Sequence, residues 1–365
     1  MDFTGGIIVS VARSEEVMEE LICEGKRVLF LTDHARILPD NYLIPDDTTL
    51  WKRFEHLDDY DVVEFYSEKR FQVYYRDASY DNALVLTSKC NSNCIMCPCS
   101  ESYRKAEVLE SAEHICRLIE YFPTDVPFLT ITGGEPTLIK EGMFDVLEKM
   151  KRHFEGTKYF LLTNGRTLSN EKYLNRFLES MPQNIRFCIP IHGYDPETHD
   201  YITQARGSFK QTEKALKHLL NHKCEVEIRI VVSKLNAEWM TKIAQYIVSH
   251  FSGVAYVNIM ATEMCGAAAL NRERVWLDYE KCFELSKKAI QILLKEGIDV
   301  QLYNFPLCKV EREYWSICMQ SISDYKIRYQ PQCEQCAVKK ICGGVFGTTL
   351  ALTKMELNPI GEHNV

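Results

Sequence analysis

From residue 83 onward, apolar runs of strand length alternate with longer segments whose apolar residues recur at helical spacing. Strand–helix alternation repeated six times predicts a parallel sheet with helices outside it. Right-handed crossovers curl such a sheet into a barrel or a partial barrel. The predicted fold class is therefore α/β, a partial (β/α)6 barrel similar to a TIM barrel. The expected strands are residues 83–88, 128–132, 159–163, 185–191, 226–232 and 255–261, and the expected helices lie near 107–122, 141–154, 170–180, 208–221, 237–251 and 278–296.

The pattern before residue 81 is different and predicts a small α+β unit. Segments 6–11, 27–32 and 71–75 have the composition of short strands, and segment 14–24 that of a helix with Ser14 as its N-cap. No group of catalytic side chains stands out in this unit. Its role is either packing or the recognition of a partner or peptide, and the sequence leaves both open. The expected domains are 1–80, the barrel 81–297 and a cysteine-rich extension 298–365.

Composition narrows the class of protein. Apolar residues make up 46% of the chain and charged residues 26%, as in soluble globular proteins. The net charge of -8 argues against a broad nucleic-acid-binding face. The first residues lack a signal-type pattern, and no stretch approaches the ~18 apolar residues of a membrane helix. We therefore expect a cytoplasmic protein with neither nucleic acid nor membrane among its partners.

Fifteen cysteines without a secretion signal point to metal ligands where they cluster. Cys90, Cys94 and Cys97 follow the first predicted strand of the barrel, within one short polar loop. The loop is too compact for pairwise disulfides, whereas three thiolates are well spaced for one soft metal centre. An iron–sulfur cluster normally takes four thiolates. Three would leave one iron open to a substrate or a cofactor.

Other glycine and polar residues follow the next strands. Gly133–Pro136 follow the second strand, Thr163–Gly165 the third, His192–Gly193 the fourth, and Ser233 and Asn236 the fifth. Because chemistry gathers at the carboxyl ends of the strands in parallel barrels, all of these residues are expected on one rim with the three cysteines. Adjacent glycines let the backbone approach a ligand closely. The carboxylate of Glu135 would suit a cationic amine.

Cys90-x3-Cys94-x2-Cys97 after one strand and Gly133-Gly134-Glu135-Pro136 after the next resemble the radical S-adenosylmethionine superfamily, over residues 83–260. The resemblance implies a partial barrel of that family's type. It also implies a [4Fe–4S] cluster that binds S-adenosylmethionine at its open iron, and a 5′-deoxyadenosyl radical formed on reduction. A flavodoxin or ferredoxin would donate the electron. Met96 departs from the aromatic residue usual before the third cysteine, but an apolar, flexible side chain can serve there.

The same resemblance implies contacts to S-adenosylmethionine. Gly133, Gly134, Glu135 and Pro136 would hold the methionine amine. Asn164, His192 and Arg229, at later strand ends, would hold the ribose and the carboxylate. Two of these assignments have alternatives. His192 can merely close a turn before Gly193, and Arg229 can point either into the barrel or out to solvent.

A second set of cysteines lies in the tail. Cys333, Cys336 and Cys342 bring three thiols together, and Cys308 is the preferred fourth, with Cys318 as the alternative. Four thiolates would close a site around zinc or a [4Fe–4S] cluster. Spacing alone does not separate the two metals. The spacing resembles the extensions of peptide-maturing radical enzymes, which implies one auxiliary [4Fe–4S] cluster.

A narrower resemblance concerns function. The cysteine loop, Pro306–Cys308, segment 322–326 and Cys333–Gly344 resemble the radical maturase of the His-Xaa-Ser repeat peptide system. That family implies a ribosomally made precursor peptide as substrate, a side-chain crosslink as product and a second radical maturase as partner. The alternatives are a radical enzyme of cofactor biosynthesis acting on a small molecule, and a non-catalytic iron–sulfur or zinc protein.

Overall fold

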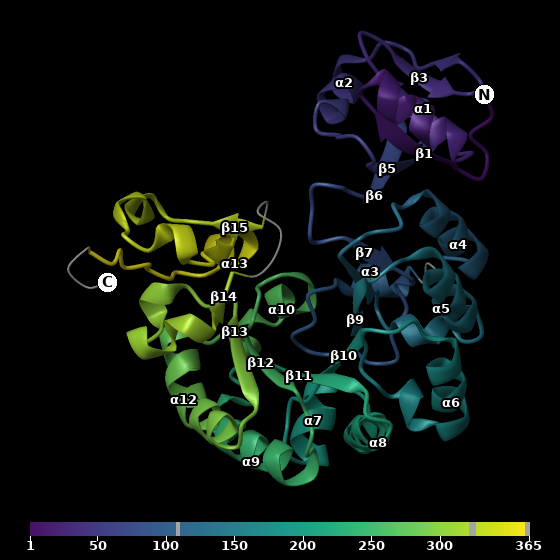
Figure 1. The fold of residues 1–365 in the computed structure, drawn as a ribbon. Coiled ribbons are helices and arrows are strands. Elements are labelled where there is room, and N and C mark those ends of the chain that lie inside the picture. Colours follow the sequence, from purple (N-terminus) through teal and green to yellow (C-terminus); the bar gives the residue numbers. More distant parts are fainter. Residues whose placement is uncertain (107–109, 321–325, 362–365) are drawn as a thin grey trace.

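The computed structural model describes residues 1–106, 110–320 and 326–361, which form two large sheets (Figure 1). The first sheet lies in the N-terminal unit, and its strands are ordered β4-β3-β2-β1-β5-β6. The strands and helices predicted for this unit are present, and β3, β4, β5 and α2 were not predicted. Ser14 caps α1 by accepting a hydrogen bond from the backbone N–H of Val17 at 3.3 Å. The elements are β1 (Ile7–Ala12), α1 (Glu15–Cys23), β2 (Val28–Leu31), β3 (Ala35–Leu38), β4 (Tyr42–Leu43), α2 (Thr48–Phe54), β5 (Val62–Ser67) and β6 (Arg70–Tyr75).

The second sheet is parallel throughout and forms the partial barrel. Its order, β14-β13-β12-β11-β10-β9-β8-β7, follows the chain, and the sheet stays open between β14 and β7. The six predicted strands are confirmed as β7 to β12, and β13 and β14 extend the sheet beyond them. The strands are β7 (Ala83–Val85), β8 (Phe128–Thr132), β9 (Lys158–Leu162), β10 (Ile185–Pro190), β11 (Glu225–Val232), β12 (Tyr256–Ala261), β13 (Asp299–Tyr303) and β14 (Cys318–Met319).

Helices cover the outer face of this sheet (Figure 1). Each turns an apolar stripe toward the strands, as in α5, where Met143, Val146, Leu147 and Met150 are buried. Six helices correspond to the predicted ones, although residues 107–109 of the first prediction lie outside the described chain. These six are α4 (Ala112–Tyr121), α5 (Gly142–His153), α6 (Glu171–Ser180), α8 (Ser208–Asn221), α9 (Met240–His250) and α12 (Tyr279–Lys295). Shorter helices lie in the loops: α3 (Glu101–Lys105), α7 (Pro196–Thr203), α10 (Gly266–Leu270) and α11 (Arg272–Val275).

The C-terminal part contains 3-10 turns, a two-stranded sheet and one short helix. Strand β15 (Ile327–Arg328) pairs antiparallel with β16 (Val345–Phe346), and α13 (Gly347–Leu352) follows. This part lies beside β13 and β14, while the N-terminal unit lies toward the β7 side (Figure 1). Of segment 322–326, which contributed to the narrower resemblance, residues 322–325 lie outside the described chain. No helix among the described residues has both the length and the apolar character needed to cross a bilayer.

The N-terminal unit meets the barrel at a partly buried group of charges. His114 of α4 lies between two carboxylates, 2.9 Å from Glu64 of β5 and 2.7 Å from Glu110. The first pair joins the N-terminal sheet to a barrel helix. These bonds raise the pKa of His114 to about 9, with the bond to Glu110 as the largest cause. The imidazole is therefore charged at neutral pH and stabilises the contact.

Candidate metal centre

The loop that carries Cys90, Cys94 and Cys97 begins where β7 ends, and the end of β8 holds its first residues in place. The backbone N–H of Gly134 donates to the carbonyl of Thr87, and that of Glu135 to the carbonyl of Lys89, both at 2.7 Å. A Cβ added at Gly134 would lie 2.2 Å from the carbonyl oxygen of Lys89. The glycine is thus required by contact with the protein's own backbone, in addition to any approach of a ligand.

The side chain of Glu135 is fully buried and joins the end of β8 to the end of β9. Its Oε1 accepts hydrogen bonds from Thr137 N at 3.1 Å, Thr137 Oγ1 at 2.6 Å and Thr163 Oγ1 at 2.7 Å, and its Oε2 accepts one from Asn164 N at 2.7 Å. Burial raises the pKa of Glu135, and the hydrogen bonds oppose that rise. Three of these donors converge on one oxygen, so the other has more room for a further donor.

Asn164 and Arg166, which follow β9, also hold the cysteine loop in place. Asn164 Nδ2 donates to Asn91 Oδ1 at 2.6 Å. The guanidinium of Arg166 donates to the carbonyl of Asn91 and, at 3.1 Å, to Ser92 Oγ. Asn164 was predicted as a cofactor contact, and the structure places its side-chain amide on the loop. The role of Arg166 was missed, because nothing in its local sequence signals a partner far away in the chain.

Helices α7 and α10 complete the support of the loop. Asn93 N–H donates to the carbonyl of Thr203 at 2.9 Å, and Ala267 N–H donates to the carbonyl of Cys97 at 2.9 Å. Gly266 has φ +52°, and a Cβ there would lie 2.2 Å from the carbonyl oxygen of Pro98. Met96 is buried in an apolar cluster beside the loop. Its aliphatic side chain therefore fills the position that an aromatic residue usually takes in the family that the loop resembles.

The three thiols are free and half-buried. Burial raises the pKa of Cys90 and raises that of Cys94 to about 12. Cys97 differs, because a hydrogen bond from the Cys99 thiol, helped by Arg104, lowers its pKa to about 6. The sequence prediction assigned no role to Cys99. As the described side chains stand, no three His, Cys, Asp or Glu residues close around a single metal ion.

The remaining two predicted contacts lie on neighbouring strands. His192 is buried, and its Nδ1 has no hydrogen-bond partner among the described residues. Arg229 alternates along β11 with Ile228 and Ile230 of the outer apolar core, so it faces the barrel interior. Its Nε donates to Glu227 at 2.6 Å, and 25% of its side chain remains exposed.

A second group of thiols lies in the C-terminal part. Cys308, Cys333, Cys336 and Cys342 line one narrow cavity of about 20 Å³, of which Cys318 is not a lining residue. Backbone N–H groups of Leu307 and Gly344 donate to the sulfur of Cys342 at 3.4 Å, and that of Ile360 to the sulfur of Cys336 at 3.4 Å. Cys318 instead donates to the carbonyl of Tyr314 at 3.5 Å.

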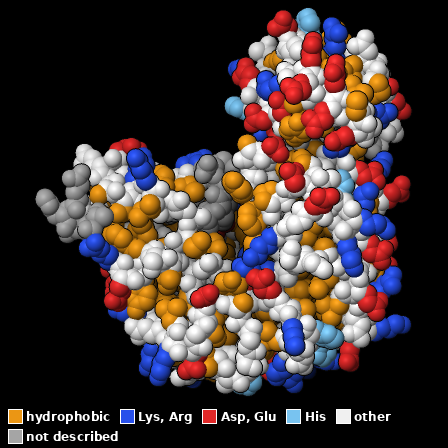
Figure 2. Space-filling model, viewed as in Figure 1, with side chains coloured by type: hydrophobic (Ala, Val, Ile, Leu, Met, Phe, Trp, Pro, Cys, Tyr) orange, Lys and Arg blue, Asp and Glu red, His pale blue; other side chains and the backbone are white. Residues whose placement is uncertain are grey.

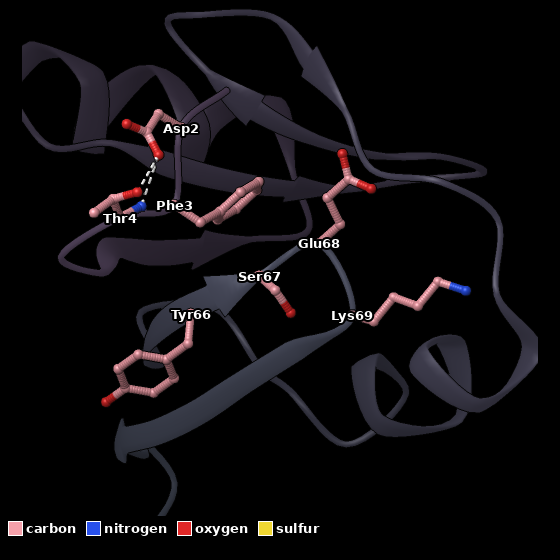
Figure 3. Close-up of a pocket in the computed structure, with 7 residues that line it drawn as sticks. All are labelled: Asp2, Phe3, Thr4, Tyr66, Ser67, Glu68 and Lys69. Carbon is pink, nitrogen blue, oxygen red and sulfur yellow. Dashed lines mark hydrogen bonds between the residues drawn. The ribbon is translucent and has the colours of Figure 1, made fainter.

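The N-terminal unit has an open hollow of about 550 Å³ between residues 2–4 and the turn from β5 to β6 (Figure 3). The carboxylate of Asp2 already accepts two hydrogen bonds there, from the N–H of Thr4 at 2.9 Å and from the hydroxyl of Thr4 at 2.6 Å. Tyr66 and Lys69 point away from each other in Figure 3, so no set of polar groups converges. Acidic side chains are numerous on this unit (Figure 2). The hollow has no geometry for catalysis.

Comparison with known proteins agrees with this arrangement. Residues 84–247 match the family model of the radical SAM superfamily. The matched segment contains the three cysteines and the glycine pair, and it runs from β7 into α9. The similarity to the radical SAM superfamily therefore lies in this segment of the barrel.

Two relatives and one solved structure illustrate the similarity. Sporulation killing factor maturation protein SkfB of Bacillus subtilis is 26% identical over 59% of this chain and 48% of its own length. The AdoMet-dependent heme synthase of Methanosarcina barkeri is 30% identical over 48% of each chain. The chain thus spans about half the length of these relatives. SuiB of Streptococcus suis, in its structure bound to S-adenosylmethionine, shares the fold with a TM-score of 0.53 and 13% identity over 77% of this chain and 76% of that one.

Proposed function

We propose that this chain is a radical S-adenosylmethionine enzyme that modifies a ribosomally made precursor peptide. The observation that carries the reaction class is the three-cysteine loop, held at the carboxyl end of a parallel barrel by Gly134, Glu135 and Asn164 within the matched domain. Each of these contacts orders a segment next to a thiol. The loop is thereby preorganised for a cluster before any metal binds.

The residues fit a [4Fe–4S] cluster held by three thiolates. Cys90, Cys94 and Cys97 supply soft ligands without disulfides, and the backbone N–H of Ser92 donates to the sulfur of Cys90. When bound, the cluster and S-adenosylmethionine supply a 5′-deoxyadenosyl radical. The chain's own part is to fix the thiols, leave one position without a thiolate and exclude water with the apolar cluster around Met96.

For S-adenosylmethionine itself we propose contacts by Gly133 to Pro136, Asn164, His192 and Arg229. Three features support this. One oxygen of Glu135 takes only one of its four hydrogen bonds, His192 keeps a buried nitrogen without a partner in the described chain, and Arg229 faces the barrel interior. Because the Asn164 amide is bound to Asn91, we propose that its main role is to position the loop.

We further propose that the C-terminal thiols hold one auxiliary [4Fe–4S] cluster, with Cys308 as the fourth ligand. Cys308 lines the same cavity as the other three, and backbone donors face two of the sulfurs. A volume of about 20 Å³ is near the size of one water molecule, so the cavity would have to open for a cluster, and zinc is the competing occupant. Metal analysis of the isolated protein separates the two.

The peptide substrate is supported by the similarity to SkfB, whose name describes the maturation of a killing factor. Anaerobic co-expression with candidate precursor peptides, encoded as short reading frames nearby, tests it by mass spectrometry. Loss of hydrogen from the peptide with wild-type enzyme, but not with Cys94→Ala, supports the proposal. An unchanged peptide together with active cleavage of S-adenosylmethionine contradicts it. Membership of the His-Xaa-Ser system, a second maturase and a flavodoxin or ferredoxin donor remain predictions.

A small-molecule substrate is the second candidate. The similarity to a heme synthase, at 30% identity, favours it. It predicts that extracts without a precursor peptide support turnover of S-adenosylmethionine above the uncoupled rate. A purely structural or electron-transfer role predicts no cleavage of S-adenosylmethionine under any condition.

A further inference from the structure

Arg104 lies on α3, the short helix that directly follows the cysteine loop. It differs from the other residues of that helix, because the other four are exposed and Arg104 is partly buried. Its Nη2 donates to Asn93 Oδ1 at 2.7 Å, and Asn93 precedes Cys94. Its Nη1 is buried and has no hydrogen-bond partner among the described residues. A buried N–H donor without a partner is costly, which indicates a partner that arrives later.

The guanidinium is anchored beside the cysteine loop, because its Nη2 is bonded to Asn93, which lies between Cys90 and Cys94 in the chain. Its positive charge acts electrostatically on each of the three thiols of the loop. Its neighbour Lys105 points elsewhere, pairing with Glu101 at 2.7 Å on the exposed face.

We propose that Arg104 is a positioning residue for the cluster at Cys90, Cys94 and Cys97, whose charge stabilises the reduced cluster and whose Nη1 donates to it. Three thiolates bring three negative charges into a half-buried loop, and reduction adds another. A nearby cation favours the more negative state and so raises the reduction potential. The inference rests on the proposed function, because it requires a cluster at this loop.

The test is a redox titration, monitored by electron paramagnetic resonance, of the full-length protein reconstituted with iron and sulfide. The signal that changes on addition of S-adenosylmethionine belongs to the cluster with the open iron. The variants are Arg104→Gln, the charge-conserving Arg104→Lys, and Lys105→Gln as the control with the same loss of charge on the same helix. We expect Arg104→Gln to make reduction about tenfold less favourable, a shift of about 59 mV to lower potential. Arg104→Lys should shift the potential much less, and Lys105→Gln should not shift it.

Two results would overturn the inference while leaving the proposed function intact. One is that the cluster has the same reduction potential in Arg104→Gln as in the control Lys105→Gln. The other is that Arg104→Lys and Arg104→Gln change the reduction potential or the iron content equally. The effect would then come from the shape of the arginine side chain and not from its charge. If Arg104→Gln cannot assemble the cluster, assembly in Arg104→Lys supports the role of charge. A wild-type protein that assembles no cluster responsive to S-adenosylmethionine rejects the proposed function itself.

Discussion

The side-chain amide of Asn164 donates a hydrogen bond of 2.6 Å to the side-chain oxygen of Asn91. Asn91 follows the first cysteine of the loop, and Asn164 follows β9, two strands away in the sheet. The backbone of Asn164 meanwhile donates to Glu135, at the end of the strand between them. The position of the three thiols therefore depends on residues from three adjacent strand ends.

Glu135→Gln should destabilise the protein by about 1–3 kcal/mol, the usual cost of a buried donor without an acceptor. A glutamine has an NH2 group in place of one carboxylate oxygen, and an NH2 group cannot accept a hydrogen bond. If it replaces Oε2, the bond from the N–H of Asn164 is lost; if it replaces Oε1, the bonds from Thr137 and Thr163 are lost. Urea unfolding of the metal-free protein measures the change. Glu141→Gln, at an exposed position in the same loop, is the control and should be neutral. Equal stability of both variants would show that the hydrogen bonds contribute little.

Gly134→Ala should displace the segment that leads into Cys90 and reduce the iron bound at that loop. The new Cβ would lie 2.2 Å from the carbonyl oxygen of Lys89 and 2.5 Å from that of Ser88, and backbone atoms cannot rotate away. Iron per chain after reconstitution measures the effect. Gly361→Ala, where the added Cβ meets nothing within 4 Å, is the matched control. Full iron content in Gly134→Ala would contradict the close packing.

The stability that His114 contributes should depend on pH. Its pKa is raised to about 9 by Glu110 first and then Glu64. Because the pKa of His114 is higher in the folded protein than its unfolded value of about 6.5, the protonated imidazole stabilises the fold. That contribution is fully present below about pH 6.5 and is lost as the pH rises through about 9. The difference in unfolding free energy between wild type and His114→Gln should be at most about 3 kcal/mol at pH 6, and should shrink by pH 9.5. His34→Gln, at an exposed histidine of the N-terminal unit, is the control. A difference independent of pH would argue against the ion pairs.

Cys308→Ser should remove the auxiliary metal, and Cys318→Ser should retain it. Cys308 lines the cavity with Cys333, Cys336 and Cys342, whereas Cys318 donates to the carbonyl of Tyr314. If both sites hold [4Fe–4S] clusters, Cys308→Ser should lower the content from roughly eight irons per chain to roughly four. The opposite result, with loss only in Cys318→Ser, would make Cys318 the ligand.

The sequence predicted the six barrel strands and the rim on which the cysteines and glycines meet. That prediction worked because hydrophobic periodicity marks each strand, and parallel connections put every strand end on the same side. Strand β14 has only two residues, Cys318 and Met319, and so is too short to show a period.

The support of the loop could not be predicted in the same way. Arg166 and Asn91 are far apart in the chain, and their contact leaves no local pattern. Cys265 is likewise far from Pro98 in the chain, yet its thiol donates to the carbonyl of Pro98 at 3.3 Å. Such contacts depend on where the folded loops meet, which residue spacing does not encode.

The most direct test of the central claim is the reductive cleavage of S-adenosylmethionine by the anaerobically reconstituted protein. The wild-type enzyme should release 5′-deoxyadenosine, and Cys94→Ala should release none, because the loop then lacks one of its three thiolates. Cys224→Ala, a cysteine outside both groups, should behave as wild type. Undiminished release by Cys94→Ala, or no release by the wild-type protein with its cluster reduced, would contradict the assignment of this loop.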